Sequence, residues 1–272
     1  MVPKAGFARF PDVRSHVRCV LAESRSYPVA SPASENQIAA MFDRVAMRYD
    51  FLNSLLSARQ DQRWRRHLAR MVPYRPKGYL LDVATGTGDV LFACARQHPE
   101  YASFAGVDIS GEMLTLAQRK SLTEFQGAAD SSNDNLGKVT WRQMSATSLE
   151  FKDESTDCLT ISFGLRNVVD KETALSEFYR VLKPGGVLII MEFFEPQSHV
   201  FSRMFQFYFR HVLPMIGGLF SDRSAYHYLP RSVGSFYSPL ALRDALKQAQ
   251  FILAEEVNFL FGSCRIVKAR KR

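Results

Sequence analysis

Short apolar runs alternate with amphipathic stretches along most of the chain. Residues 79–83 form one such run, typical of a buried strand, which ends in a turn of small residues containing Gly86 and Gly88. From Thr87 onward apolar residues recur with a helical period, at Val90, Leu91, Ala93 and Cys94. Strand, glycine turn and helix in this order predict the first unit of an open α/β sheet, which binds nucleotides at the turn. Glycine lets a ligand come close, and the first N–H groups of a helix attract polar atoms.

The same alternation continues to the end of the chain. Further strands are predicted at 106–110, 139–143, 157–163, 187–193, 251–257 and 263–269, and helices from 35 onward and at 113–120, 172–182 and 239–250. Ser34 is the expected N-cap of the first helix. We therefore predict an α/β domain over residues 35–272, with a mostly parallel seven-stranded sheet and helices on both faces.

An acidic residue strengthens the interpretation of the glycine turn. Asp108 lies in the second predicted strand, 20 positions after Gly88. A carboxylate at about this distance can accept hydrogen bonds from both hydroxyls of a ribose, so an adenosine-containing cofactor is expected. A turn that merely joins two elements is the alternative. A dinucleotide oxidoreductase would need a further glycine at position 91, which is leucine here.

Two other segments carry polar residues close together. Asp43, Tyr49 and Asp50 lie within one short stretch, which reads either as part of a site or as the outer face of an amphipathic helix. Arg166 and Asn167 follow the fourth predicted strand, whose carboxyl end faces the ligand crevice of a parallel sheet. Their alternative role is to cap the loop.

Aromatic residues and methionines crowd residues 197–237. Their density exceeds what one face of a helix buries, so we expect a lid over an apolar ligand rather than plain core. Tyr226 and Tyr228 lie in this segment. Residues 127–137 are predicted to be a surface loop.

Composition narrows the class of protein. The chain has 272 residues, 46% of them hydrophobic and 23% charged, as in globular proteins, and no apolar run approaches the roughly 18 residues that span a bilayer. The four cysteines lack metal-ligand spacing, so no metal site is expected and a reducing compartment is favoured. Residues 1–34 are rich in arginine and serine, which fits an organelle targeting segment, a disordered extension or a start codon assigned too far upstream.

Four stretches of the chain combine into a recognisable pattern. They are the Phe42-Asp43, Ala46, Tyr49-Asp50 and Asn53 pattern with Leu55-Leu56-Ser57 and Trp64-Arg65, the Leu81 to Asp89 turn, the segment 160–168, and the segment 179–186. Together they resemble the class I S-adenosylmethionine-dependent methyltransferases, and more narrowly the quinone-biosynthesis C-methyltransferases of the UbiE/MenG family. The glycine turn is common to all such methyltransferases, whereas the first and third stretches are specific to the quinone enzymes. A looser match covers Tyr226 to Leu229.

The resemblance implies a Rossmann-like fold and S-adenosylmethionine as the cofactor. Besides Gly86 and Gly88, it implies cofactor contacts at Thr87, Asp108, Ser145, Ala146 and Ser162. The implied reaction is C-methylation of a reduced prenylated quinol, either a demethylmenaquinol or a demethylated benzoquinol. The candidates for activating or stabilising its ring are Asp43, Tyr49, Asp50, Arg166, Tyr226 and Tyr228.

The implied setting is a membrane surface. An enzyme of a lipid quinol should contact the membrane peripherally, in the cytoplasm at the inner membrane, or in an organelle if residues 1–34 are a targeting segment. Association with a second copy or with a quinone-synthesis complex is also expected. The net charge of +8 is moderate and best explained by a solvated basic surface, so no nucleic-acid partner is expected.

The chain departs from the family pattern near the presumed acceptor side. Arg59 stands where a glycine is usual, and Asp61-Gln62 where His-Arg is common. These departures leave two alternatives open, a methyltransferase with a different small-molecule acceptor and a non-catalytic scaffold of a quinone-synthesis complex.

Overall fold

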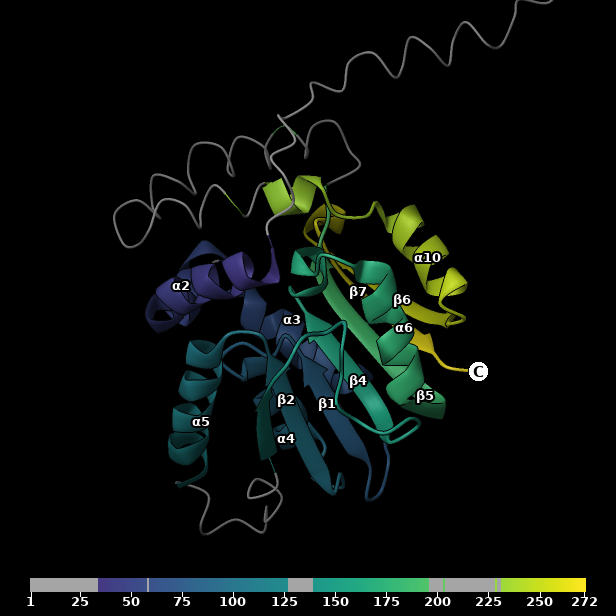
Figure 1. Ribbon diagram of the computed structural model, residues 1–272, viewed down its shortest axis with the longest axis horizontal. Coiled ribbons are helices and arrows are strands. Elements are labelled where there is room, and N and C mark those ends of the chain that lie inside the picture. The colour runs from purple at the N-terminus through teal and green to yellow at the C-terminus, as the bar shows by residue number, and fades with distance from the viewer. Residues whose placement is uncertain (1–33, 58, 127–138, 196–202, 204–227, 229–230) are drawn as a thin grey trace, which may run out of the picture. The chain divides into compact units, whose positions relative to one another are not determined.

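The computed structural model describes residues 34–57, 59–126, 139–195, 203, 228 and 231–272 (Figure 1). The expectations for the N-terminal extension, for the 127–137 loop and for most of the 197–237 lid, Tyr226 included, lie outside these residues. None of the described helices has the length and apolar character needed to cross a bilayer.

The described residues contain one seven-stranded sheet with the order β3-β2-β1-β4-β5-β7-β6. The first five strands pair in parallel, and β7 is antiparallel to both of its neighbours. The predicted fold class is therefore confirmed. The strands are β1 Tyr79–Val83, β2 Ser103–Asp108, β3 Val139–Gln143, β4 Thr156–Ser162, β5 Leu182–Phe193, β6 Ile252–Phe259 and β7 Cys264–Arg270.

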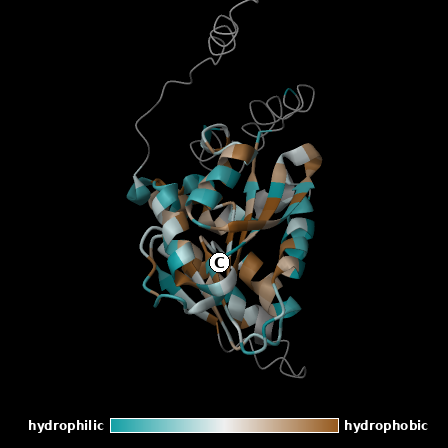
Figure 2. Cartoon of the chain, turned by 90° about the vertical axis from the view of Figure 1, so that its right-hand side faces the viewer, coloured by the Kyte–Doolittle hydropathy of each residue, from teal (hydrophilic) through white to brown (hydrophobic). Residues whose placement is uncertain are grey.

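Helices cover both faces of the sheet (Figure 1). On one face α3 and α4 pack against the side chains of Leu80 and Ile189, and on the other α6 and α10 pack against Leu81 and Ile190. Figure 2 shows the hydrophobic residues gathered between the layers. The helices are α2 Glu35–Leu56, α3 Gln60–Met71, α4 Asp89–Gln97, α5 Gly111–Gln126, α6 Lys171–Val181 and α10 Pro239–Gln248.

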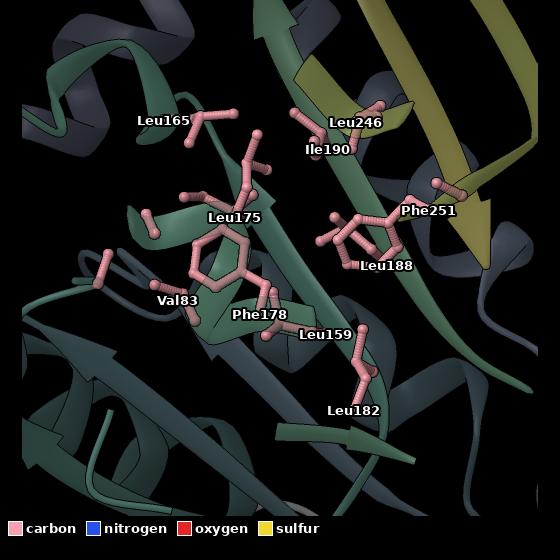
Figure 3. Packing of buried hydrophobic residues seen from close by; sticks show 14 of the residues in the cluster. Val83, Leu159, Leu165, Leu175, Phe178, Leu182, Leu188, Ile190, Leu246 and Phe251 are labelled. Carbon is pink, nitrogen blue, oxygen red and sulfur yellow. The ribbon is translucent and has the colours of Figure 1, made fainter. Parts of the chain in front are cut away.

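The α6 and α10 face shows how the period of each element produces the core. In Figure 3, Phe178 of α6 points toward Leu159 of β4, and Phe251 lies against Leu188 of β5. Residues on alternate positions of a strand face opposite sides, so one short strand serves both helix layers. Burying a side chain of this size contributes roughly 1.5–3 kcal/mol.

Local capping residues set where the helices begin. The Ser34 hydroxyl accepts a hydrogen bond from the Gln37 N–H, and the Gln37 side chain accepts one from the Ser34 N–H, which confirms the predicted cap of α2. Asp170 and Ser238 cap α6 and α10, since their side-chain oxygens accept hydrogen bonds from the N–H groups of Thr173 and Ala241. Several boundaries differ from prediction, since β2 spans Ser103–Asp108 rather than 106–110 and α5 spans Gly111–Gln126 rather than 113–120. The largest shift at a strand start is in β5, which begins at Leu182 rather than 187, where Leu182 already pairs with Thr156 before a shift of register.

The ends of β1 and β4 come very close together at the carboxyl edge of the sheet. A Cβ built on Gly164 would lie 2.4 Å from the Cβ of Ala84. Ala84 and Phe163, each the first residue after its strand, both adopt positive φ angles, of 51° and 54°. The two chains therefore turn sharply where the strand order reverses, and such a reversal point is where open α/β sheets bind ligands.

Candidate active site

A pocket opens at this edge of the sheet, between the turns that follow β1 to β4 and the overlying helix α2. Its empty space is about 640 Å³ when the solvent at its open mouth is counted. Its residues are Glu35, Ile38, Phe42 and Tyr49 from α2, Ala84 and Gly86 after β1, Asp108, Ile109 and Met113 after β2, Met144, Ser145 and Ala146 after β3, and Phe163, Gly164, Asn167 and Val168 after β4.

Asp108 occupies the position expected for a ribose-binding carboxylate. One of its oxygens accepts the Gly86 N–H at 2.8 Å and the other accepts the Ser110 N–H at 2.9 Å. Burial raises the pKa of this carboxyl group, and the backbone N–H donors oppose that shift. Within the described residues neither oxygen pairs with a cation, so both keep lone pairs for hydroxyl donors in the pocket.

The two glycines of the turn have different surroundings. Gly86 lines the pocket, and a Cβ built on it would meet nothing within 4 Å. Gly88 does not line the pocket, and a Cβ there would lie 2.8 Å from the ring of Trp141. Both have positive φ angles, of 56° and 85°. Gly86 therefore keeps the ligand side open, whereas Gly88 permits tight packing beneath the turn.

Thr87 and Asp50 are brought together, but neither lines the pocket. The Thr87 hydroxyl donates to Asp50 at 2.6 Å and accepts from the Lys120 ammonium at 3.0 Å. Lys120 also pairs with Asp50 and Asp89, and Arg65 pairs with Asp89 and Asp61. This charge network joins α2, α3, α4 and α5 around the glycine turn, so it holds the turn in place.

Asp82 is a buried carboxylate beneath the turn whose role the sequence did not reveal. It is 1% exposed and accepts hydroxyl hydrogen bonds from Thr85 at 2.7 Å and from Thr160 at 2.6 Å. Burial raises its pKa to about 7, although the two hydroxyls oppose the shift. Asp82 thus ties the turn after β1 to strand β4.

The predicted contacts after β3 lie in the pocket wall together with a residue that sequence analysis missed. Ser145 and Ala146 both line the pocket, and the Ser145 hydroxyl donates to Glu35 at 2.8 Å. Glu35 sits at the start of α2, 110 positions earlier in the chain. No local pattern could have revealed this contact.

Among the described residues, three buried polar atoms at the end of β4 and just after it have no hydrogen-bond partner. They are Ser162 Oγ, Arg166 Nε and Asn167 Oδ1, and the described residues contain only one other such atom, Thr156 Oγ1. Buried polar atoms are rarely left unpaired in a native protein. Because Asn167 lines the pocket, this cluster indicates that the edge is built to meet a polar ligand.

Arg166 is anchored by a buried carboxylate. Its Nη1 donates to Glu192 and to the Phe163 carbonyl oxygen, both at 2.5 Å, and Glu192 is fully buried. Burial raises the pKa of Glu192, and the charge of Arg166 opposes that shift. The pair fixes the guanidinium and leaves its Nε without a partner.

The remaining described candidates are Asp43 and Tyr49 on α2 and Tyr228 farther along the chain. Tyr49 lines the pocket, whereas Asp43 accepts a hydrogen bond from the Ser110 hydroxyl and so supports the start of α5. Burial raises the pKa of Tyr228, and the charges of Arg166 and Glu192 act on that pKa in opposite directions.

The model of the ubiE/COQ5 methyltransferase family matches residues 31–271. The chain belongs to this family. It is 46% identical to the ubiquinone/menaquinone biosynthesis C-methyltransferase UbiE of Geotalea daltonii, over 86% of this chain and 96% of that protein. It is 40% identical to the demethylmenaquinone methyltransferase of Thermus thermophilus, over 83% of this chain and 97% of that protein.

Solved structures of the same fold are more distant in sequence. A possible histamine N-methyltransferase from Thermotoga maritima matches 86% of this chain and all of its own with a TM-score of 0.58 at 20% identity. The geranyl diphosphate C-methyltransferase of Streptomyces coelicolor matches 79% and 80% of the two chains with a TM-score of 0.57 at 14% identity. At these identities the similarity establishes the class I fold alone.

The predicted enzyme class and cofactor are thereby confirmed, since members of this methyltransferase family use S-adenosylmethionine. The pocket suits that cofactor, because Asp108 can accept the ribose hydroxyls, Gly86 leaves its side of the turn open, and Asn167 offers an unpaired oxygen. When bound, the cofactor supplies an electrophilic methyl group on a sulfonium. None of the individual cofactor contacts is tested, so all seven stay predictions: Gly86, Thr87, Gly88, Asp108, Ser145, Ala146 and Ser162.

Proposed function

We propose that this methyltransferase transfers the methyl group to a ring carbon of a reduced, prenylated quinol, in the biosynthesis of menaquinone or ubiquinone. The observation that carries the proposal is the identity of 40–46% to curated quinone methyltransferases over more than four fifths of the chain. The pocket supports it, because Phe42, Tyr49, Phe163 and Val168 give it an aromatic and apolar wall.

The residues of the pocket have separate tasks in this reaction. Asp108 and the turn at Gly86 hold the adenosine part of the donor, and the aromatic side chains of Phe42 and Phe163 exclude water from the acceptor side. Positioning of donor and acceptor supplies much of the acceleration in such a displacement.

A quinol carbon becomes nucleophilic when a ring hydroxyl loses its proton, because the charge spreads into the ring. Arg166 cannot take that proton at ordinary pH, but its unpaired Nε can donate to the oxygen on which charge develops. Tyr228, whose pKa responds to the charges of Arg166 and Glu192, is the candidate to pass the proton on. Tyr49 is the alternative, since it lines the pocket.

We further propose that the protein works at the surface of the membrane that holds its lipid substrate. This is the cytoplasmic face of the inner membrane, or an organelle membrane if residues 1–34 are a targeting segment. Leu260 and Phe261, in the turn between β6 and β7, are 50% and 71% exposed. The turn belongs to the carboxyl edge, because Cys264 after it pairs with Phe193 at the end of β5.

The direct test is turnover of two reduced acceptors, a demethylmenaquinol and a demethylated benzoquinol, each in detergent with S-adenosylmethionine. We expect one of them to gain a single methyl group on the ring, detected by mass spectrometry, and its oxidised quinone to be inert. Cofactor binding without methylation of either quinol would contradict the proposed acceptor and favour another small molecule or a scaffold role.

A further inference from the structure

Glu35 is the one acidic residue that α2 contributes to the pocket lining. Its Oε1 accepts hydrogen bonds from the Ser145 hydroxyl at 2.8 Å and from the Thr147 hydroxyl at 3.4 Å. No other residue of the described chain bonds Oε2. One face of the carboxylate is thus held by the loop after β3, while its second oxygen is left without a partner.

The position of Asp108 decides which part of the cofactor reaches Glu35. Strand β2, which ends at Asp108, lies between β1 with its glycine turn and β3. If Asp108 holds the ribose, the base lies on the side of the loops that follow β2 and β3. Apolar side chains line the pocket there and suit the faces of a flat ring; they are Ile38, Ile109, Met113, Met144 and Ala146.

The edge of an adenine ring needs polar partners in such a pocket. Its exocyclic amino group is a donor, and an ionised carboxylate only accepts hydrogen bonds. Ser145 and Glu35 are the polar side chains on this side of the pocket, and the Ser145 hydroxyl already donates to Glu35. Glu35 therefore has the acceptor that an amino group requires.

We propose that Glu35 is a specificity-determining residue that accepts a hydrogen bond from the exocyclic amino group of adenine. The inference rests on the cofactor being S-adenosylmethionine, and it does not depend on which acceptor is methylated. It assigns to the first turn of α2 a direct part in recognising the base, from across the pocket.

The test is a double-mutant cycle between the protein and the ligand. Binding of S-adenosylhomocysteine is compared by calorimetry with binding of its 6-deamino analogue, in which purine replaces adenine. The wild-type protein should prefer the amino ligand by about tenfold to a hundredfold, the range expected for a hydrogen bond to a charged group. Glu35→Ala should bind both ligands with nearly equal affinity, and Glu35→Gln, which keeps a neutral acceptor, should show an intermediate preference.

The control is Glu112→Gln, because Glu112 is an exposed acidic residue in the first turn of α5 that does not line the pocket. Its preference should equal that of the wild type. If Glu35→Gln and Glu35→Ala keep the wild-type preference, or weaken both ligands by the same factor, Glu35 only holds α2 in place and the proposal is wrong. Should Glu35→Ala fail to fold, Glu35→Gln decides the question alone. Failure to bind S-adenosylhomocysteine at all would instead count against the cofactor assignment.

Discussion

At the scale of single residues, neighbouring positions in one turn perform unlike tasks. Gly86 and Gly88 are separated by one residue, yet one faces the ligand pocket and the other faces the ring of Trp141. The reason is that successive residues of a tight turn point in different directions. A residue in this motif therefore cannot be assigned to cofactor binding from its place in the motif alone.

Alanine at these two glycines should separate binding from stability. Gly86→Ala introduces backbone strain of about 1 kcal/mol and a methyl group at the pocket, so it should weaken S-adenosylhomocysteine binding while the protein remains folded. Gly88→Ala adds a clash with Trp141 and should lower the free energy of unfolding by about 2–3 kcal/mol. Calorimetric titration and urea unfolding measure the two effects. Equal effects of the two changes on binding would contradict the distinction.

Asp82 should make stability depend on pH in a defined direction. Its pKa is raised from 3.8 to about 7 in the folded state, so the native protein favours its protonated form. The stabilisation is complete below about pH 4 and is lost as the pH rises toward 7, by up to about 4 kcal/mol. Asp82→Asn removes this titration.

Urea unfolding of both proteins between pH 4.5 and 8.5 tests the prediction for Asp82. The stability of the wild type relative to Asp82→Asn should fall as the pH rises and then level off above about pH 7. Titration of other groups cancels in this difference, because both proteins contain them. A difference that stays constant with pH would show that the carboxylate is already ionised in the fold.

Arg166 has both a structural and a proposed catalytic role, and a pair of variants can separate them. Arg166→Ala leaves the fully buried Glu192 without its partner and should destabilise the protein by about 3–5 kcal/mol. The double variant Arg166→Met/Glu192→Met should recover much of that stability. If the guanidinium stabilises the developing phenolate, the double variant still loses about a hundredfold or more in kcat.

Affinity for S-adenosylhomocysteine serves as the second readout for Arg166. It should change little in the double variant, because the proposed role concerns the acceptor. Turnover at the wild-type rate in a stable double variant would restrict Arg166 to its structural pairing with Glu192.

At the scale of elements, the shape of the pocket depends on the contacts that hold α2 over the carboxyl ends of the strands. Asp50 of α2 is held by Lys120 of α5 at 2.5 Å and by Thr87 of the glycine turn. Asp43 of α2 also accepts a hydrogen bond from Ser110 at the start of α5. The polar stretch of α2 thus carries both the pocket residue Tyr49 and the contacts that orient the helix.

The ion pairs of Lys120 with Asp50 and Asp89 should link the position of α2 to the affinity for the cofactor. Lys120→Met should weaken S-adenosylhomocysteine binding several-fold, with a coupling energy to Asp50→Asn of at most about 1 kcal/mol, since both side chains are about one third exposed. The coupling should shrink as salt is added. Arg142→Met, which removes an exposed ion pair with Glu150, is the control and should leave binding unchanged. Equal losses of binding affinity in Lys120→Met and Arg142→Met would contradict a specific role for the ion pairs of Lys120.

At the scale of the whole molecule, the fold brings several loops to the carboxyl edge of the sheet, and the residues of these loops determine the chemistry. Class I structures at 14–20% identity share this architecture but carry names with different substrates, including histamine and geranyl diphosphate. A common fold therefore does not identify the acceptor. For this chain the acceptor class is indicated by the family match and the named relatives.

Membrane contact is a prediction about the edge that carries the pocket. Leu260→Ser/Phe261→Ser should lower co-sedimentation with vesicles of phosphatidylcholine and phosphatidylglycerol by about tenfold or more, since two large apolar side chains would no longer insert. Ile252→Ser/Leu253→Ser is the matched control, because these residues are 47% and 42% exposed at the opposite end of β6. If both pairs reduce vesicle binding equally, the turn is not the contact. The expected dimer or quinone-synthesis complex stays a prediction, to be checked by light scattering.

Apolar periodicity predicted every strand of the sheet, and capping residues such as Ser34 placed the start of a helix, because these signals act between residues close in the chain. Helix α3 was not predicted as a separate element. The spacing from Gly88 to Asp108 also predicted a carboxylate at the pocket, because the length of one parallel crossover unit is nearly constant.

The contacts between side chains around the cofactor site follow from tertiary packing and could not be predicted from the sequence. Glu35 reaches Ser145, Lys120 reaches Asp50, and Arg166 pairs with the buried Glu192. Each contact joins residues that are far apart in the chain, and its geometry depends on how the helices and strands pack against one another. Sequence patterns reflect local conformational preferences and the periodicity of apolar residues. They can therefore predict which polar residues lie at the carboxyl edge of the sheet. They cannot predict which of these residues face the ligand and which hold the others in place.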